Sequence, residues 1–580
     1  MIDAVKRPSF AMVWGEIEPR VKALLILLSS LWLVVVVLLP VGQLLVKSVT
    51  NASGQFVGLA NFAHYVKTPA LADSIPNSLF VSTVTTLIAV PSGFLYAYAL
   101  TRSCLPAKGA FKGVAMIPLF APTLLNGIAL IYLFGRKGLI TRGFFGAIPG
   151  FDIHLYGPVG IILSEIIYTF PQAVLILSIA LSMTDARLYE ASESLKAGRV
   201  RTFFTVTLPS VKYGLTSAIF VCFILTFTDF GAPKVVGGNY NILATDIYKQ
   251  VIGQQNFTMG AVVSVVLLVP TLFAFVLDRV VQKKQVAMVS GRSVPLTPKP
   301  EKTKDRLLLG YCLLVGFLIV GFYGTALFAS LVKVWPYKLS LGLWHYNFTG
   351  TGGGGYTAFF NSIRVALCTA FFGTIITFTS AWLVEKAGEA KAARQATYLL
   401  SMLPLALPGL VIGLSYIFFF NAKGWTLFGT FIPNPFEGIY GTMAIVVICN
   451  IVHFYTVSFL TATTALKQLD SAFETVADSM GVPFYKTFMK VTVPICLPAI
   501  MEIALYYFVN AMVTVSAVIF LYSADLPLAS VAIANMDDAG DIAPACAMAM
   551  LVVFTNIVCR LLYEVVHKMV QKKRELTAKI

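Results

Sequence analysis

Long apolar runs recur along this chain, and they restrict its fold more than any other feature of the sequence. A helix needs roughly 20 apolar residues to cross the ~30 Å hydrocarbon core of a bilayer. Since lipid offers no hydrogen-bond partners to the backbone, each run of that length is expected to be helical. The sequence therefore predicts an all-α integral membrane protein with about twelve spans. The predicted spans are residues 24–46, 79–101, 113–134, 158–182, 213–234, 259–278, 307–332, 363–385, 396–419, 441–465, 500–521 and 543–564.

Composition agrees with a membrane protein. Hydrophobic residues make up 57% of the 580 residues and charged residues only 12%, whereas soluble domains carry about 25% charged residues. The formal net charge is +16, but the basic residues lie between apolar runs, so membrane topology explains them better than nucleic-acid binding does. The eight cysteines include no CxxC pair and lie mostly in apolar segments. Neither a disulfide framework nor a metal site is expected.

The loops between the apolar runs predict the orientation of the chain. Residues 102–112 contain three bases and no acid, and the tail from Lys568 is also basic. Both are therefore expected in the cytoplasm. Residues 522–542 carry four aspartates and no base, which suits the opposite side, although the bases between Arg136 and Arg142 oppose this pattern. An even number of spans then places both termini in the cytoplasm.

The chain consists of two similar halves. Pro209 and Pro494 end two similar segments about 285 residues apart, and Pro122 matches Pro408 at nearly the same offset. Several matches in one order indicate a tandem duplication. Because each copy has six spans, an even number, the repeats are expected to be parallel. The predicted division is residues 1–280 for the first repeat, 281–306 for a charged, proline-containing cytoplasmic linker, and 307–580 for the second repeat.

A polar segment recurs after the fourth span of each copy, where the chain is expected to lie in the cytoplasm. The first copy is YEASESLKAGRVRTFFTVTLP (189–209) and the second is ETVADSMGVPFYKTFMKVTVP (474–494). Acidic residues near the start suit the positive end of a helix dipole, and a glycine follows, so each segment predicts a short helix. Small side chains within this helix protrude little from its surface, so another protein can approach the helix closely.

These segments resemble the EAA loop of binding-protein-dependent ABC import permeases, in which an acidic-small-small start precedes a glycine and a Leu-Pro. Glu190 begins the match in the first copy, where Lys196 stands at the glycine position. Gly481 fits in the second copy, where Thr475 replaces the glutamate. The resemblance implies that the helix docks in a groove of a separate ATP-hydrolysing subunit; the alternative is an amphipathic cytoplasmic loop without a partner. The residues implied in coupling are Tyr189, Glu190, Ala191, Ser192, Glu193, Lys196, Gly198, Pro209, Glu474, Thr475, Ala477, Asp478, Gly481 and Pro494.

The sequence contains no motif for nucleotide binding or for catalysis. No G-x-x-x-x-G-K-[ST] phosphate loop occurs, so the energy source is expected to come from a partner. The five histidines are dispersed, and neither HExxH nor GxSxG is present. We therefore expect a non-catalytic transport subunit without a cofactor, which binds two copies of an ATP-hydrolysing subunit.

Ionisable groups and helix breakers inside the apolar runs are candidates for a translocation pathway. Asp229 lies near the outer end of the fifth span beside Gly231 and Pro233, which are expected to loosen the helix there; a solvated helix end is the alternative. Glu165 and Asn450 occupy equivalent positions in the two copies, where hydrogen bonding between spans is the alternative. Prolines and glycines in the third span of each copy can interrupt it or only kink it. The candidates are Pro122, Asn126, Gly127, Glu165, Asp229, Pro408, Gly409, Gly413 and Asn450.

Over nearly its whole length, the fused double permease resembles the group that comprises iron(III) importers and 2-aminoethylphosphonate importers. Residues 59–71 (LANFAHYVKTPAL) and 227–257 resemble the 2-aminoethylphosphonate branch more. The resemblance implies a bacterial inner-membrane permease that receives a small solute, here a phosphonate, from a periplasmic binding protein. Iron(III) is the alternative within the class. The alternative from another class is an ion-gradient-driven secondary transporter, in which the two EAA-like loops would lack a purpose.

Overall fold

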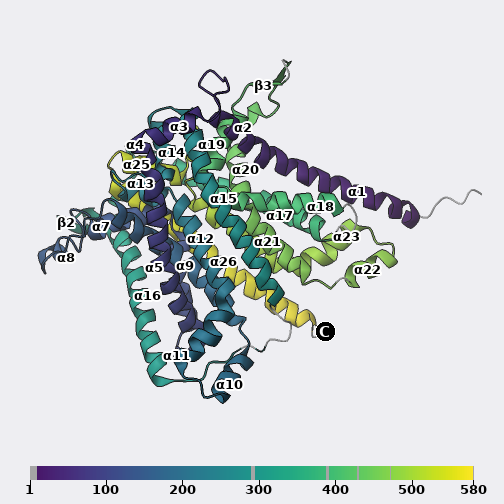
Figure 1. Cartoon of the computed structure of the whole chain (residues 1–580), viewed down its shortest axis with the longest axis horizontal. Helices are drawn as coiled ribbons and strands as arrows, with labels where there is room; N and C mark the ends of the chain where they lie inside the picture. The colour runs from purple at the N-terminus through teal and green to yellow at the C-terminus, as the bar shows by residue number, and fades with distance from the viewer. Residues whose placement is uncertain are drawn as a thin grey trace, which may run out of the picture. The chain divides into compact units, whose positions relative to one another are not determined.

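A computed structural model describes residues 10–288, 294, 296–386, 391–427, 430–470 and 472–578 of the protein, and helices dominate it (Figure 1). Within these ranges, nine helices are long and apolar enough to cross a membrane. The number rises to eleven if each of two sharply bent helix pairs counts as one span. This confirms the predicted all-α membrane class, while the number of twelve spans stays a prediction.

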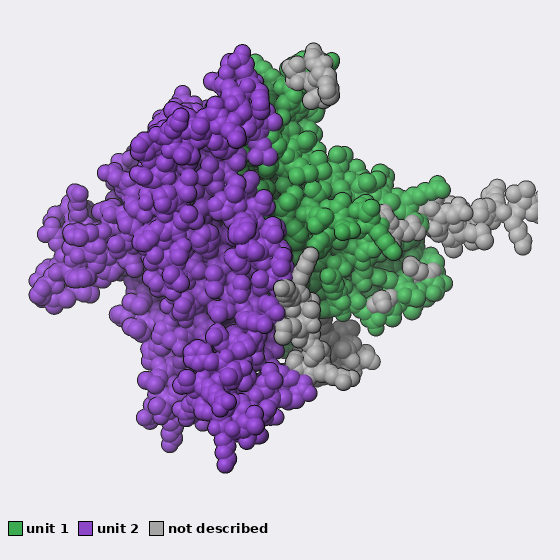
Figure 2. All heavy atoms as spheres, viewed as in Figure 1, with its two compact units in different colours: residues 1–44, 360–526, 555–580 green, residues 45–359, 527–554 purple. Residues whose placement is uncertain are grey.

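The chain forms two compact units, whose boundaries differ from those of the predicted sequence repeats (Figure 2). Each unit contains most of one repeat together with the first predicted span of the other. The division into sequence repeats therefore describes the duplication of the chain and stays a prediction, whereas the units describe its packing. Unit 1 comprises Met1–Leu44, Phe360–Leu526 and Thr555–Ile580, and unit 2 comprises Leu45–Phe359 and Pro527–Phe554.

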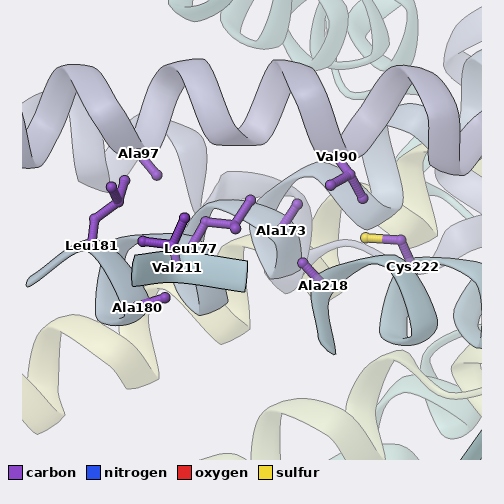
Figure 3. Packing of buried hydrophobic residues seen from close by; sticks show 9 residues of the cluster. All are labelled: Val90, Ala97, Ala173, Leu177, Ala180, Leu181, Val211, Ala218 and Cys222. Carbon is purple, nitrogen blue, oxygen red and sulfur yellow. The ribbon is translucent and has the colours of Figure 1, made fainter. Parts of the chain in front are cut away.

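Unit 2 is built on three long helices, α5 (Ser74–Arg102), α9 (Pro158–Ser182) and α12 (Leu208–Thr228). Small residues let them approach closely, as is common between helices in lipid. A Cβ atom placed on Gly93 of α5 would lie 2.6 Å from the Cβ of Ala173 in α9. Figure 3 shows the apolar side chains between the three helices, which are Val90, Ala97, Ala173, Leu177, Ala180, Leu181, Val211, Ala218 and Cys222.

Further helices of unit 2 pack around this core. α15 (Phe257–Met288) contacts α12, and α16 (Lys302–Leu331) contacts α5. The hydroxyl group of Tyr311 in α16 donates a hydrogen bond of 2.8 Å to the carbonyl oxygen of Ser92 in α5. The shorter elements are α3 (Ala60–Lys67), α4 (Pro69–Ala72), α6 (Lys108–Ala115), α7 (Thr123–Phe134), α8 (Gly143–Gly146), α10 (Ala186–Ser194), α11 (Arg199–Thr202), α13 (Gly231–Val236), α14 (Leu243–Tyr248), α25 (Ala529–Asp538) and an antiparallel hairpin of β1 (Val332–Val334) and β2 (Lys338–Leu341).

Unit 1 contains the N-terminal helix packed onto the second repeat. Ser29 and Ser380 share a hydrogen bond of 2.8 Å, and the hydroxyl group of Tyr416 donates to the carbonyl oxygen of Val36 at 2.8 Å. The elements are α1 (Phe10–Leu33), which continues through Val34–Leu38 into α2 (Leu39–Ser48), α17 (Gly355–Lys386), α18 (Lys391–Met402), α19 (Gly409–Phe420), α20 (Met443–His453), α21 (Tyr455–Lys467), α22 (Ala472–Ser479), α23 (Phe484–Thr487), α24 (Val493–Val513), α26 (Ile542–Ala578) from Thr555 onwards, and the hairpin of β3 (Gly424–Leu427) and β4 (Thr430–Pro433).

Several predicted spans are interrupted, and the structure corrects their boundaries. The run 113–134 divides into α6, a short 3-10 turn and α7, and the run 396–419 bends by 112° between α18 and α19. Pro122 and Pro408 stand directly before α7 and α19. Proline lacks a backbone donor and disfavours helix in the residue before it, which explains both breaks. α12 and α24 end at Thr228 and Val513, before the predicted ends at 234 and 521.

Candidate coupling loops and pathway residues

The first predicted coupling segment contains α10 and α11, followed by a π-helical turn (Phe203–Thr207) that leads into α12. Asp185 caps α10, because its carboxylate accepts hydrogen bonds from the backbone N–H of Arg187 at 3.1 Å and from its guanidinium at 2.6 Å. These hydrogen bonds lower the pKa of Asp185 to about 2. The cap therefore stays charged at neutral pH. The buried hydroxyl group of Ser192 lies 2.7 Å from that of Thr202, which joins α10 to α11.

The two loops have the same backbone geometry where α10 and α22 end. Lys196 and Gly481 both have left-handed conformations, with φ of 54° and 64°. Just beyond each, a backbone N–H donates to the carbonyl oxygen five residues earlier, from Ala197 to Ser192 at 3.0 Å and from Val482 to Ala477 at 2.9 Å. This is the hydrogen bond of a Schellman-type helix end, which glycine normally provides. Lys196 thus takes the same left-handed conformation in the first loop as Gly481 takes in the second.

Gly198 plays a different structural part. Its φ is −67°, which any residue adopts, and it precedes α11 as the N-cap residue. Of the two glycine positions considered for the first loop, the left-handed one is Lys196.

The second loop carries an apolar groove of about 520 Å³ beside α22. Phe473 and Val476 of α22 line it together with Met480, the residue directly after this helix, and these residues are 51%, 53% and 68% exposed. Lys486 and Lys490 also line it. Exposed apolar surface that gathers on one face of a helix is typical of a protein interaction site. The remaining lining residues are Ala472, Ala477, Val482, Thr487 and Val491.

The apolar groove residues were missed in the sequence, although their spacing could have indicated them. Phe473, Val476 and Met480 recur at intervals of three and four, which places them on one face of a helix. Similarity to the motif instead indicates the acidic and small residues of this segment.

The predicted acidic residues lie in different environments. Glu190 and Glu193 are exposed on α10, and Glu193 forms an ion pair with Lys299 at 3.0 Å. Glu474 instead pairs with Lys386, at the end of α17, at 3.2 Å. The side chain of Asp478 lies outside the described residues. Glu474 is thus tied to its own unit, while the acidic groups of α10 face solvent.

The other predicted coupling residues either pack inside the loops or lie at their ends. The hydroxyl group of Tyr189 donates to that of Thr207 at 3.0 Å. Ala477 is buried, at the position equivalent to Ser192, whereas Ala191 and Thr475 are exposed. Pro209 and Pro494 each stand in the first turn of α12 and α24.

The pathway candidates of the first repeat meet inside unit 2. Glu165 in α9 is fully buried, and its carboxyl group lies close enough to that of Asp229, directly after α12, for the two to interact electrostatically. Neither carboxyl oxygen of Glu165 has a hydrogen-bond partner in the described part of the chain. Asp229 accepts a hydrogen bond of 3.0 Å from the backbone N–H of Ala232 and lies near Thr123, the first residue of α7. Asn126, one turn further along α7, accepts from the hydroxyl group of Tyr323 at 2.8 Å. The breaks after α12 and before α7 therefore adjoin one buried acidic pair.

Glycines bring these broken helices close together. A Cβ atom on Gly127 of α7 would lie 2.6 Å from the Cβ of Val235 in α13, and a Cβ on Gly231 would collide with the hydroxyl group of Thr123. In unit 1, a Cβ on Gly413 of α19 would lie 2.6 Å from the carbonyl oxygen of Ala517, and one on Gly409 would collide with Ser516. Both units thus pack the helix after the proline break against the segment that follows the fifth span.

The acidic pair has no counterpart in unit 1. Asn450 of α20 stands at the position equivalent to Glu165, and it is fully buried. Neither polar atom of its side chain has a hydrogen-bond partner among the described residues. Thr514, directly after α24, stands where Asp229 stands in the first repeat. The two repeats therefore share their backbone breaks but not the charge beside them.

Known proteins share this sequence organisation. The family model described as "Binding-protein-dependent transport system inner membrane component" matches residues 89–286 and 373–572. A permease protein of Haemophilus influenzae that is named for ferric transport is 29% identical over 78% of this chain and 70% of its own length. The ferric transport system permease protein of Actinobacillus pleuropneumoniae is 28% identical over 84% of this chain and 70% of its own length. The molybdenum transport system permease protein of Escherichia coli is 32% identical over 27% of this chain and 67% of its own length.

The two matched regions include both predicted coupling loops and the broken helices described above. The ferric permeases match along most of the chain, so the similarity extends over both copies of the domain. With nine helices of the described residues long and apolar enough to cross a membrane and this domain present twice, the chain belongs to the inner-membrane components of binding-protein-dependent transport systems and is a multi-pass permease of an ABC importer.

Proposed function

We propose that this permease forms the translocation pathway of the importer and docks two copies of an ATP-hydrolysing subunit, one on α10–α11 and one on α22–α23. The shared backbone geometry of the two loops carries the proposal, since Lys196 and Gly481 end both helices in the same way. Each loop continues through a π-helical turn directly into a long helix, α12 or α24. A partner that moves the loop therefore also moves the span.

Docking at the second loop is testable through the apolar groove. Val476→Asp places a charge on an exposed groove residue and leaves the core intact, so the permease is expected to insert and fold normally. Binding of the ATP-hydrolysing subunit is expected to weaken by about tenfold or more, because a buried unpaired charge costs at least 1–3 kcal/mol. Binding is measured with the purified permease in nanodiscs.

Ser479→Asp is the matched control, since Ser479 is exposed on the same helix and does not line the groove. This variant is expected to bind as the unaltered chain does. Equal binding by the Val476→Asp and Ser479→Asp variants would exclude the groove as a docking site.

The energy source separates this function from a secondary transporter. Transport by reconstituted vesicles is expected to require ATP and the ATP-hydrolysing subunit, and to persist when an ionophore collapses the ion gradients. Transport that stops with the ionophore and continues without ATP would contradict the proposal.

For the solute, we propose ferric iron delivered by a periplasmic binding protein. The support is the similarity along most of the chain to permeases named for ferric transport. 2-Aminoethylphosphonate is the second candidate, favoured by residues 59–71 and 227–257. Stimulation of ATP hydrolysis by the binding protein loaded with either solute decides between them, and stimulation by the phosphonate-loaded protein alone would overturn the ferric proposal.

A further inference from the structure

The linker between the two repeats lies against the first coupling loop in unit 2. Its described residues between α15 and α16 are Val294 and residues 296–301, and they are called the linker strap below. The backbone N–H of Ala186, the first residue of α10, donates to the carbonyl oxygen of Val294 at 2.9 Å. Near the other end of α10, Glu193 pairs with Lys299 at 3.0 Å. The linker strap therefore contacts both ends of α10.

The linker strap is also tied to the start of α16. Glu301 directly precedes α16 and forms an ion pair with Arg199 of α11. Asp305, in the first turn of α16, accepts hydrogen bonds from the backbone N–H groups of Glu301 at 3.0 Å and Cys104 at 3.2 Å. The thiol group of Cys104 donates to the carbonyl oxygen of Pro298 at 3.3 Å. Hydrogen bonds and ion pairs thus connect α10 and α11 with the start of α16 through the linker strap.

α16 extends this connection to the pathway candidates. Tyr311 donates to the carbonyl oxygen of Ser92 in α5, and Tyr323 donates to Asn126 in α7, each at 2.8 Å. Asn126 lies one turn after the break at Pro122. A contiguous set of packed and hydrogen-bonded elements is a physical route by which two distant sites can influence each other.

We propose that the linker strap forms part of the surface on which the ATP-hydrolysing subunit docks at the first loop, and that it fastens this loop to α16. The inference rests on the proposed docking function of the loop. Glu190 and Glu193 are exposed one turn apart on α10, so they share one side of the helix. The Lys299 side chain is 81% exposed beside Glu193. A protein that covers this side of α10 therefore also meets the linker strap.

The second loop offers a different surface. There Glu474 pairs with Lys386 of α17, from the same repeat, and the exposed apolar groove lies beside α22. The two copies of the ATP-hydrolysing subunit therefore meet different surfaces. One surface combines the first loop with the linker strap, and the other is the apolar groove of the second loop.

Binding to the first loop tests the composite surface. In a Val476→Asp background, which disables the second loop, Lys299→Glu places like charges beside Glu193 and is expected to weaken binding about twofold to fivefold, the range of an exposed ion pair. The charge swap Glu193→Lys/Lys299→Glu is expected to restore binding. Lys302→Glu is the control, because its exposed side chain has no ion-pair partner in the described part of the chain.

The outcomes distinguish this inference from the proposed function. If Val476→Asp and Glu190→Arg abolish binding together while Lys299→Glu has no effect, the loop docks the partner and the linker strap takes no part. An equal loss with Lys302→Glu, or no rescue by the charge swap, likewise overturns the inference. If binding survives Val476→Asp combined with Glu190→Arg, the docking function itself fails.

The connection to α16 has its own measurement. Arg199→Glu breaks the ion pair with Glu301 and is expected to lower the solute transported per ATP hydrolysed about twofold, with rescue by Arg199→Glu/Glu301→Arg. Arg201→Glu is the control, since Arg201 is exposed on the same loop. An unchanged ratio in Arg199→Glu, or the same loss in Arg201→Glu, would contradict the connection.

Discussion

Lys196 and Gly481 hold the same left-handed backbone conformation with very different side chains. Glycine adopts it freely, whereas a side chain with a Cβ atom meets the following carbonyl oxygen, at a cost of roughly 1–2 kcal/mol. The first loop keeps this conformation because the Schellman-type hydrogen bond and the contact of Ser192 with Thr202 hold it on both sides. The loops are thus alike in backbone and unequal in strain.

Lys196→Gly and Gly481→Lys are therefore expected to act in opposite directions. Lys196→Gly removes strain and is expected to stabilise the end of α10 by about 1 kcal/mol, while Gly481→Lys destabilises the end of α22 by a similar amount. Amide hydrogen exchange of the two loops measures both changes. Gly198→Ala is the control, because Gly198 has an ordinary φ of −67°. Faster exchange in α10 after Lys196→Gly would contradict this account.

Asp246 in α14 predicts a pH dependence of stability. The residue is buried, and burial raises the pKa of its carboxyl group to about 6. A raised pKa means that folding favours the protonated form, so this contribution to stability is full below about pH 4 and is lost as the pH rises through 6. Asp246→Asn is expected to stabilise the protein at pH 7.5 by up to about 3 kcal/mol. Thermal unfolding of the Asp246→Asn variant in detergent at pH 7.5 and 4.5 checks this. An equal gain in stability at both pH values would exclude titration of the Asp246 carboxyl group as its cause.

Helices in unit 2 depend on glycine at the points of closest approach. Gly93 lets α5 approach Ala173 of α9, while Gly321 of α16 has nothing within 4 Å of the place of a Cβ atom. Both glycines lie inside long apolar helices, so they form a matched pair in which only the packing differs.

Gly93→Ala is expected to destabilise unit 2 by about 1–3 kcal/mol, because overpacking forces helices apart. Gly321→Ala is expected to be neutral or to stabilise by up to about 1 kcal/mol through helix propensity. Thermal unfolding of the two purified variants makes the comparison. Equal unfolding midpoints for the two variants would show that α5 and α9 can move apart without loss of stability.

The acidic pair lies beside three elements, since Glu165 belongs to α9, Asp229 follows α12 and Thr123 begins α7. If the pair serves transport, Glu165→Gln keeps the size of the side chain and the fold but removes its ability to ionise, so we expect slower transport with an unchanged unfolding midpoint. Transport is measured in vesicles. A lower midpoint with normal transport in the remaining folded protein would assign the pair to packing alone, as hydrogen bonding between spans predicts.

The two predicted repeats exchange their first spans, since α1 packs with the second repeat in unit 1 and α16 packs with the first repeat in unit 2. Tyr311 and Tyr323 of α16 bond to α5 and α7, and Ser29 and Tyr416 join α1 to its neighbours in unit 1. Each half of the chain therefore lacks one helix of the unit that it mainly builds.

A chain divided within the linker tests this exchange. Neither half alone is expected to resist protease in membranes, whereas the two halves expressed together are expected to reassemble and gain resistance. Two halves that are equally resistant when alone would contradict the exchange of spans.

Local patterns in the sequence determined the membrane class, the duplication and the two loops, because apolar length, Lys and Arg in loops and the motif spacing are properties of contiguous residues. The sequence left open whether Pro122 and Pro408 interrupt their spans or only kink them, and the structure shows a break at each. Only the tertiary structure decided that α1 and α16 change places, that the linker strap lies on α10, and that Glu165 meets Asp229. These contacts join residues far apart in the chain, and a hydrophobic run in lipid looks the same whichever neighbour it packs against.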